Sequence, residues 1–146
     1  MLRRLRPIFE SFQKHDVRYV VFDGIAVALH GVPRATFDLD ILVEPTAENA
    51  RKLLKALEAC GFATATQVTA EEVATTQITR LKDRLPIDIM TSTPGLTFDE
   101  AWQNRVQMEF EGQSFHVISR DDLIRAKRAS GRPRDAEDLK ALGAGE

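Results

Sequence analysis

The spacing of apolar residues at the start of the chain is typical of a helix. Leu2, Leu5, Phe9 and Phe12 recur at intervals of three or four residues, which predicts an amphipathic helix over residues 2–14. The arginines between them would face outward while the apolar stripe packs on the rest of the domain. This segment is therefore expected to be a packing element.

A strand, a tight turn and a short helix are predicted next. Residues 17–22 form a β-branched and aromatic run of strand length, which ends at Asp23 and Gly24. Residues 25–30 suit a short helix, and the glycine and proline of segment 31–33 would end it. The predicted order is strand, glycine-containing turn and helix.

A second strand and a longer helix follow. Residues 37–43 alternate acidic and apolar side chains with a period of two, which predicts a strand with two different faces. Thr46 is a suitable N-cap for a leucine-containing helix, and Gly61 stands where a left-handed C-terminal cap prefers glycine.

The second half of the chain contains shorter segments. Strands are expected over residues 62–68, 75–81 and 85–90, a short helix over 98–102, a hairpin of 106–110 and 114–118 turned at Glu111-Gly112, and two final helices, one over about 120–129 and one after Pro133. Ser119, with Asp122 three residues later, would cap the first of these two helices. Because no repeat, linker or low-complexity tract interrupts the pattern, residues 1–146 are predicted to form a single α+β domain with a mixed sheet flanked by helices.

The composition describes an ordinary globular protein. Apolar residues make up 43% and charged residues 29% of the 146 positions, and the formal net charge of −2 creates no global field that would attract a polyanion. No apolar run approaches the ~20 residues of a membrane span, and the first residues lack the pattern of a secretory signal. A cytoplasmic location without a membrane partner is expected.

Two further features of the composition restrict the chemistry. The single cysteine, Cys60, excludes an internal disulfide and a cysteine-based zinc cluster, and it is expected only to pack. Basic residues gather near both ends and are interleaved with acids, so most of them are predicted to lie on solvated helix faces. They are Arg3, Arg4, Arg6, Arg125, Lys127, Arg128, Arg132 and Arg134.

Two aspartates on a predicted strand are the strongest candidate for chemistry. Asp38 and Asp40 are two residues apart, so they project from the same face of the strand. Their mutual repulsion requires a cation or strong donors nearby, and Mg²⁺ prefers such hard oxygen ligands. Asp88 lies in an apolar strand, where a lone charge is costly unless it is paired, and it is the expected third acid. The alternative is that these acids only decorate a solvated sheet face, since Asp-x-Asp is a weak motif.

The surrounding residues carry a resemblance to a known family. The strand-to-helix turn Asp23-Gly24, the pair Arg34 and Thr36, and the strand with Asp38 and Asp40 occur in this order. With them the chain resembles the minimal nucleotidyltransferases of the DNA polymerase β superfamily, especially those related to abortive-infection and toxin–antitoxin systems. The resemblance covers most of the chain, implies the nucleotidyltransferase fold and maps the family's third acid to Asp88.

The resemblance also implies an activity. Asp38, Asp40 and Asp88 would hold two Mg²⁺ ions, which neutralise the entering and leaving oxygens when they lie about 3.5–4 Å apart. A nucleoside triphosphate such as ATP would supply a nucleoside monophosphate to a hydroxyl of tRNA, another RNA, a protein or a small molecule. A cognate toxin or antitoxin would be a possible partner. The implied nucleotide-binding residues are Asp23, Gly24, Arg34, Thr36 and Lys127, although Arg34 could equally balance the acids.

Asp23 departs from the family pattern, which has glycine at this position. Glycine allows the backbone amides at the helix start to approach phosphates, whereas a carboxylate would cap the helix itself and repel a triphosphate. Asp23 therefore indicates a weakened transferase, a side chain turned away from the site, or an engineered substitution. The first of these favours a second hypothesis, a non-catalytic module that binds a protein partner or a nucleotide. Simple RNA binding through the basic ends is disfavoured by the near-neutral charge.

Lys127 lies on the predicted apolar face of its helix, together with Leu123 and Ile124. A buried ammonium needs an acidic partner, and Asp135 and Asp138 in the last helix are the candidates. We expect a lysine–aspartate network that clamps the last two helices. The alternative is a direct contact with phosphate, because the resembling proteins carry a similar lysine that faces the active cleft.

Overall fold

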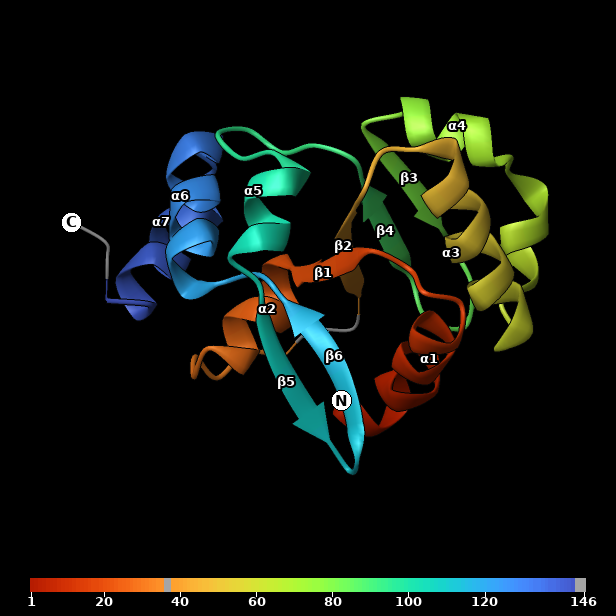
Figure 1. The fold of residues 1–146 in the computed structure, drawn as a ribbon. Helices are drawn as coiled ribbons and strands as arrows, with labels where there is room; N and C mark the ends of the chain where they lie inside the picture. The colour runs from red at the N-terminus through yellow and green to blue at the C-terminus, as the bar shows by residue number, and fades with distance from the viewer. Residues whose placement is uncertain (36–37, 144–146) are drawn as a thin grey trace.

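The computed structural model describes residues 1–35 and 38–143 as a mixed sheet flanked by helices (Figure 1). The strands are β1 (Tyr19–Phe22), β2 (Leu39–Val43), β3 (Ile78–Leu81), β4 (Ile87–Met90), β5 (Val106–Phe110) and β6 (Gln113–Val117). The helices are α1 (Leu2–Lys14), α2 (Asp23–Leu29), α3 (Ala47–Ala59), α4 (Ala70–Thr75), α5 (Phe98–Gln103), α6 (Arg120–Ser130) and α7 (Pro133–Ala141), with a 3₁₀ helix over Ala63–Gln67. None of the described helices is long and apolar enough to cross a bilayer.

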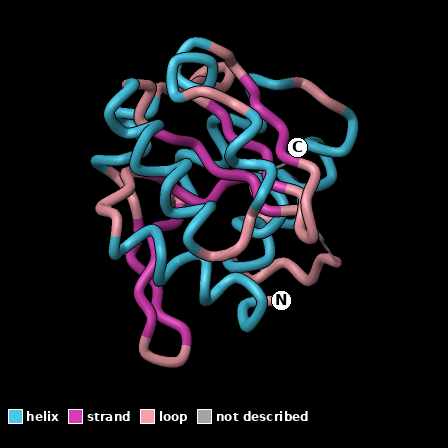
Figure 2. Tube along the Cα trace, turned by 90° about the vertical axis from the view of Figure 1, so that its right-hand side faces the viewer, coloured by secondary structure: helices cyan, strands magenta, loops and turns pink. Residues whose placement is uncertain are grey.

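The strands form one sheet in the order β3-β4-β2-β1-β6-β5. The central strand β1 runs antiparallel to β2 and parallel to β6, and β2 runs parallel to β4. Helices lie on both sides of this sheet (Figure 2). On one side α1 packs against α3 and β6, and on the other α2 packs against β1, β2 and α6. The second side is the one that carries the candidate site.

The core joins α1 to the sheet through aromatic side chains. The ring of Phe9 stacks on that of Phe115 with 4.5 Å between centroids, and Phe12 and Tyr19 lie 4.7 Å apart. Cys60 is half-buried and its thiol points to the carbonyl of Leu57 at 3.5 Å, in line with the packing role predicted for it.

Most predicted helix ends coincide with capping interactions. The Thr46 hydroxyl accepts a hydrogen bond from the amide of Asn49, and the Ser119 hydroxyl accepts one from the amide of Asp122. Gly61 has a φ of +96°, the left-handed conformation predicted for the residue after the helix. The predicted helices at 2–14, after Thr46, at 98–102 and after Ser119 are therefore confirmed.

The predicted hairpin in the C-terminal half of the chain is also confirmed. Strands β5 and β6 pair antiparallel across Glu111 and Gly112. Both turn residues have positive φ values, +47° and +80°, as a two-residue turn of type I′ requires. Of the predicted strand 37–43, β2 comprises Leu39–Val43. Asp38 was expected in this strand but directly precedes it and is exposed, and Phe37 lies outside the described residues.

The segment between α3 and β4 differs from the prediction. Residues 62–68 were expected to be a strand, but they contain the 3₁₀ helix, and the start of the expected strand 75–81 belongs to α4. The hydroxyl and amide of Thr64 both bond to the carboxylate of Asp83, which ties this segment to the β3–β4 loop. Thr69 caps α4 by accepting from the amide of Glu72. Tertiary contacts and a cap thus outweigh the β-propensity of the threonines.

Candidate metal and nucleotide site

The pairing of two strands brings the predicted acids together. Asp40 on β2 lies directly opposite Asp88 on the parallel strand β4, so both side chains leave the same face of the sheet. Asp38 joins them at a cavity of about 560 Å³. The cavity is lined by Asp23, Asp38, Asp40, Arg80, Leu81, Lys82, Asp83, Pro86, Asp88, Arg132 and Arg134.

The negative charges of Asp38 and Asp40 at this cavity are not balanced by a nearby cation among the described residues. Burial, followed by the negative charges of Asp23 and Asp88, raises the pKa of Asp40 to about 7. Among the described residues no cation forms a salt bridge with Asp38 or Asp40, while Arg80 Nε lies 3.5 Å from Asp88 Oδ1. Of the three acids only Asp40 is buried, while Asp88 is half-buried and Asp38 is exposed. Carboxylate oxygens are the ligands that Mg²⁺ prefers, so these residue types suit a magnesium site, although among the described residues only Asp23, Asp135 and Asp138 have ligand oxygens that all lie within 4.8 Å of one another.

Asp23 adopts an unusual backbone conformation at the start of α2. Its φ is +52°, in the left-handed region that glycine enters freely and aspartate tolerates better than most residues. Its carboxylate oxygens lie 3.1 Å from Lys127 Nζ, 3.4 Å from Arg132 Nη2 and 3.9 Å from Arg134 Nη2. Asp23 thus occupies a glycine-type position and turns its charge toward three cations.

Lys127 is the centre of a buried ion cluster. Its side chain is 2% exposed, and its ammonium lies 3.0 Å from Asp135 and 2.9 Å from Asp138 in addition to Asp23. Burial disfavours the ammonium, but hydrogen bonds to Asp138, Asp135 and Asp23 and the charge of Asp23 outweigh it, so the pKa of Lys127 is raised. Ligand oxygens of the three aspartates lie within 4.8 Å of one another, yet the lysine ammonium already sits among them. The three carboxylates therefore bind the Lys127 ammonium and are not proposed as a second metal site.

The predicted partners of Lys127 are therefore confirmed, with Asp23 as an unpredicted third one. Lys127 is buried, as its place on the apolar face of its helix predicted. Arg132 and Arg134 are exposed, as predicted for most of the basic residues near the ends, but they also lie beside Asp23 and line the cavity. These contacts help to balance the charge of the buried Asp23.

The other predicted binding residues lie at different distances from the cavity. Arg34 donates to Asp138 at 2.6 Å, so it balances an acid of the lysine cluster instead of Asp38 or Asp40. Gly24 is buried within α2. Thr36 lies outside the described residues.

The two basic residues on the β3 side of the cavity were not predicted from the sequence. Arg80 lies opposite Asp88 in the β3–β4 pair, and Lys82, two residues later, also lines the cavity. Arg80 and Lys82 are two residues apart, the same spacing that placed Asp38 and Asp40 on one face in the prediction. The spacing points to the cavity only when β3 is paired with β4, because that pairing sets Arg80 opposite Asp88.

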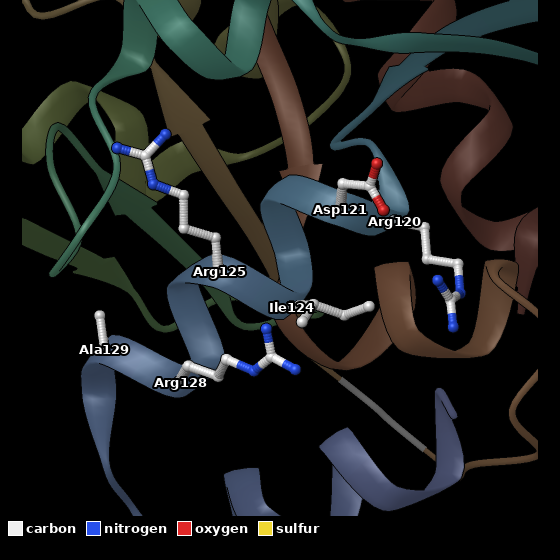
Figure 3. A pocket seen from close by; sticks show the side chains of 6 residues that line it. All are labelled: Arg120, Asp121, Ile124, Arg125, Arg128 and Ala129. Atoms are coloured by element: carbon white, nitrogen blue, oxygen red, sulfur yellow. The ribbon is translucent and has the colours of Figure 1, made fainter. Parts of the chain in front are cut away.

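A larger hollow, about 640 Å³, runs along the outer face of α6 (Figure 3). Arg120, Arg125 and Arg128 project from this helix, with Asp121 as the acid among the labelled residues. Arg125 is paired with Glu100 at 2.7 Å, and Arg120 donates to the carbonyl of Leu142. Asp121 is the one carboxylate among the described residues that line this hollow, so it does not resemble the predicted acidic site.

Asp40 and Asp88 on neighbouring strands, with Asp38 directly before β2, line one cavity beside the strand-to-helix turn at Asp23. Residues 3–143 match the family model described as "Nucleotidyltransferase of unknown function (DUF6036)", and the chain belongs to this family. Its structure is similar to the crystal structure of a protein from Thermotoga maritima that is provisionally described as a nucleotidyltransferase. That likeness has a TM-score of 0.63 at 22% identity, and it covers 95% of this chain and 89% of the other. No protein with a curated description matches the chain.

The likeness at this identity concerns the fold. The predicted α+β architecture, a mixed sheet flanked by helices in the nucleotidyltransferase fold, is confirmed. The family assignment supports a general nucleotidyltransferase class for the protein.

Proposed function

We propose that this protein is a magnesium-dependent nucleotidyltransferase that moves a nucleoside monophosphate from a nucleoside triphosphate to an acceptor hydroxyl. The observation that carries the proposal is the in-register pair Asp40 and Asp88, which meets Asp38 at one cavity without a cationic partner for Asp40 among the described residues. When bound there, two Mg²⁺ ions would neutralise the entering and leaving oxygens. The acceptor oxygen would bond to the α-phosphorus as the bond to the β-phosphate oxygen breaks, releasing pyrophosphate.

The triphosphate would be held on the side of the cavity that faces α2 and α7. Arg132 and Arg134 lie there with more than half of each side chain exposed, so they can contact a phosphate without first leaving a buried site. Guanidinium groups are well suited to phosphate oxygens because they offer several fixed donors. Asp23 is the internal anion with which a triphosphate would compete for these donors.

A labelling experiment tests the proposal. The protein is incubated with radiolabelled nucleoside triphosphates, Mg²⁺ and a cell extract, and labelled products are separated. We expect a labelled RNA, protein or small molecule that is lost in Asp38→Ala and Asp40→Ala and retained in Asp99→Ala, a control on α5 outside the cavity. No label from the wild-type protein, or equal label from the Asp40→Ala variant, would refute catalysis at this site.

Metal binding is expected to stabilise the wild-type protein. Mg²⁺ binds only the folded arrangement of Asp40 and Asp88, so millimolar MgCl₂ should raise the unfolding temperature by about 2–5 °C. The rise is measured by differential scanning fluorimetry at constant ionic strength. It should disappear in Asp88→Asn and persist in Asp99→Asn; an equal rise in both variants would place the metal elsewhere.

Replacing Asp23 with glycine is expected to raise the affinity for Mg²⁺-ATP by about tenfold, because the change removes a repulsive charge and frees Arg132 and Arg134. Isothermal titration calorimetry measures the dissociation constant. Asp16→Gly is the matched control, since Asp16 also has a positive φ of +54° but lies outside the cavity. Equal or weaker binding by Asp23→Gly would show that its carboxylate does not oppose the nucleotide.

A second candidate function is a catalytically weakened module that acts by binding a protein or a nucleotide, for example in a toxin–antitoxin pair. The observation that favours it is the Asp23 carboxylate, which already engages Arg132 and Arg134. The two functions differ in the labelling experiment. Label transfer that appears only with Asp23→Gly would support the weakened module.

A further inference from the structure

The order of the strands places the acids between two groups of cations. Arg80 and Lys82, here called the β3 wall, lie on or directly after the edge strand β3. Arg132 and Arg134, the α7 wall, lie beside Asp23 at the end of β1. Because the sheet runs β3-β4-β2-β1, the acids of β4 and β2 lie between these two walls.

The two walls differ in how their charge is balanced. On the α7 wall, Arg132 binds Asp135 at 2.7 Å as well as Asp23. On the β3 wall, Arg80 is 66% exposed and contacts Asp88 at 3.5 Å, and Lys82 is exposed without a salt bridge to any described residue. The β3 wall therefore presents two exposed cations to the cavity, beside Asp83, whose carboxylate is bonded to Thr64.

Metal binding at the acids would leave more unpaired positive charge on the β3 wall. A cation held by the acids would compete with Arg80 for the carboxylate of Asp88. Arg80 would then be without its acidic partner and stand beside Lys82 as a second uncompensated cation. Arg80 lies on β3 and Lys82 directly follows its last residue, and both line the cavity. They form a short basic edge that an extended polyanion can follow.

The stereochemistry of the proposed transfer assigns a role to this edge. In-line displacement requires the attacking oxygen and the departing pyrophosphate to lie on opposite sides of the α-phosphorus. If the pyrophosphate leaves toward the α7 wall, the acceptor hydroxyl must approach from the side of the β3 wall. A cationic surface at that side is suited to an acceptor that carries phosphate near its hydroxyl.

We propose that the acceptor is the 3′ end of a single-stranded RNA, whose backbone phosphates bind Arg80 and Lys82. This inference rests on the proposed nucleotidyltransferase function. The terminal 3′ oxygen would form a bond to the α-phosphorus, the bond between that phosphorus and the bridging oxygen would break, pyrophosphate would leave, and the hydroxyl proton would pass to solvent. A neutral small molecule would not use the two cations.

RNA binding by charge variants tests the inference. The probe is a ten-nucleotide single-stranded RNA with 5′ fluorescein and a free 3′ hydroxyl, titrated in Mg²⁺ and followed by fluorescence polarisation. Lys82→Glu should weaken binding at least tenfold, and the slope of log affinity against log salt should fall by about 0.7 for each phosphate that the variant no longer binds. Lys55→Glu, the same charge change at an exposed position of α3 outside the cavity, should have less than a twofold effect. Thermal unfolding establishes that both variants are folded.

Nucleotide binding separates this inference from the proposed function. Mg²⁺-ATP affinity measured by calorimetry should fall by a larger factor in Arg134→Glu than in Lys82→Glu, because Arg134 is the one of the two that is proposed to contact the triphosphate. Equal RNA affinities for Lys82→Glu and Lys55→Glu, or no RNA binding by the wild-type protein, would overturn the inference and point to a protein or small-molecule acceptor. Absence of Mg²⁺-ATP binding by the wild-type protein would instead overturn the proposed function, whatever the RNA result.

Discussion

An Asp40→Asn variant is expected to lose at least 10³-fold in nucleotide transfer and yet to be more stable than the wild-type protein. The amide cannot replace an anionic metal ligand, so charge stabilisation at the reacting phosphate is lost. The same amide removes a buried charge that Asp23 and Asp88 repel. We expect a gain of roughly 1–3 kcal/mol in the free energy of unfolding at pH 8 without metal.

The gain in unfolding free energy of Asp40→Asn is expected to increase with pH. The pKa of Asp40 is raised to about 7 in the folded protein, above the ordinary value of an unfolded aspartate, so folding takes up a proton between these two values. The carboxyl group therefore destabilises the fold increasingly as the pH rises toward and past 7. Asp40→Asn should show its full stability gain at pH 8 and almost none near pH 4.

Chemical denaturation at several pH values measures the gain, and the labelling assay measures transfer. Asp99→Asn provides a control in which a solvent-exposed aspartate on α5 is changed. A variant at position 40 that is less stable than the wild-type protein at pH 8 would show that the carboxylate has a stabilising partner. Retained transfer would show that Asp40 is not a metal ligand.

Replacing Lys127 with methionine is expected to destabilise the protein by about 3–5 kcal/mol, because removal of one member of a buried ion pair leaves unpaired charge in the interior. Three carboxylates, those of Asp23, Asp135 and Asp138, would be deprived of their shared ammonium. Asp135 is most affected, since it is completely buried. Burial opposes its charge, but hydrogen bonds from Arg132, Ser130 and Lys127 outweigh burial and lower the pKa of Asp135 to about 2.

Urea denaturation of Lys127→Met and of Lys140→Met, an exposed control on α7, measures this loss. The loss should be largest at neutral pH and shrink in acid, where the carboxylates of the variant take up protons. Affinity for Mg²⁺-ATP should change less than stability does. A Lys127→Met variant that is as stable as the wild-type protein but no longer binds nucleotide would assign the lysine to phosphate binding.

The lysine cluster connects the fold to the proposed chemistry. Through Asp23 it joins the turn before α2 to α6 and α7, and the same aspartate holds Arg132 and Arg134 at the cavity. A substitution in the cluster is therefore expected to affect nucleotide binding indirectly, through the position of these arginines. The Lys127 and Asp23 variants together distinguish this indirect route from a direct one.

Local patterns in the chain determined much of the structure. The apolar period of residues 2–14, the caps Thr46 and Ser119 and the Glu111-Gly112 turn each depend on contacts within a few residues, and each is found as predicted. The alternation around Asp38 and Asp40 also indicated a strand, which is found with Asp40 in it and Asp38 directly before it. Such features are readable because side-chain periodicity and cap hydrogen bonds are short-range properties of the backbone.

Long-range pairing was decided only by the tertiary structure. The register that sets Asp40 opposite Asp88 comes from strands separated by more than forty residues, and the predicted strand at 62–68 gave way to a 3₁₀ helix held by Asp83. The contacts of Asp23 with Lys127, Arg132 and Arg134 also join distant segments. Residue spacing along one chain specifies which face a side chain occupies, but the charges it meets there depend on how separate elements pack, and that packing is a property of the whole core.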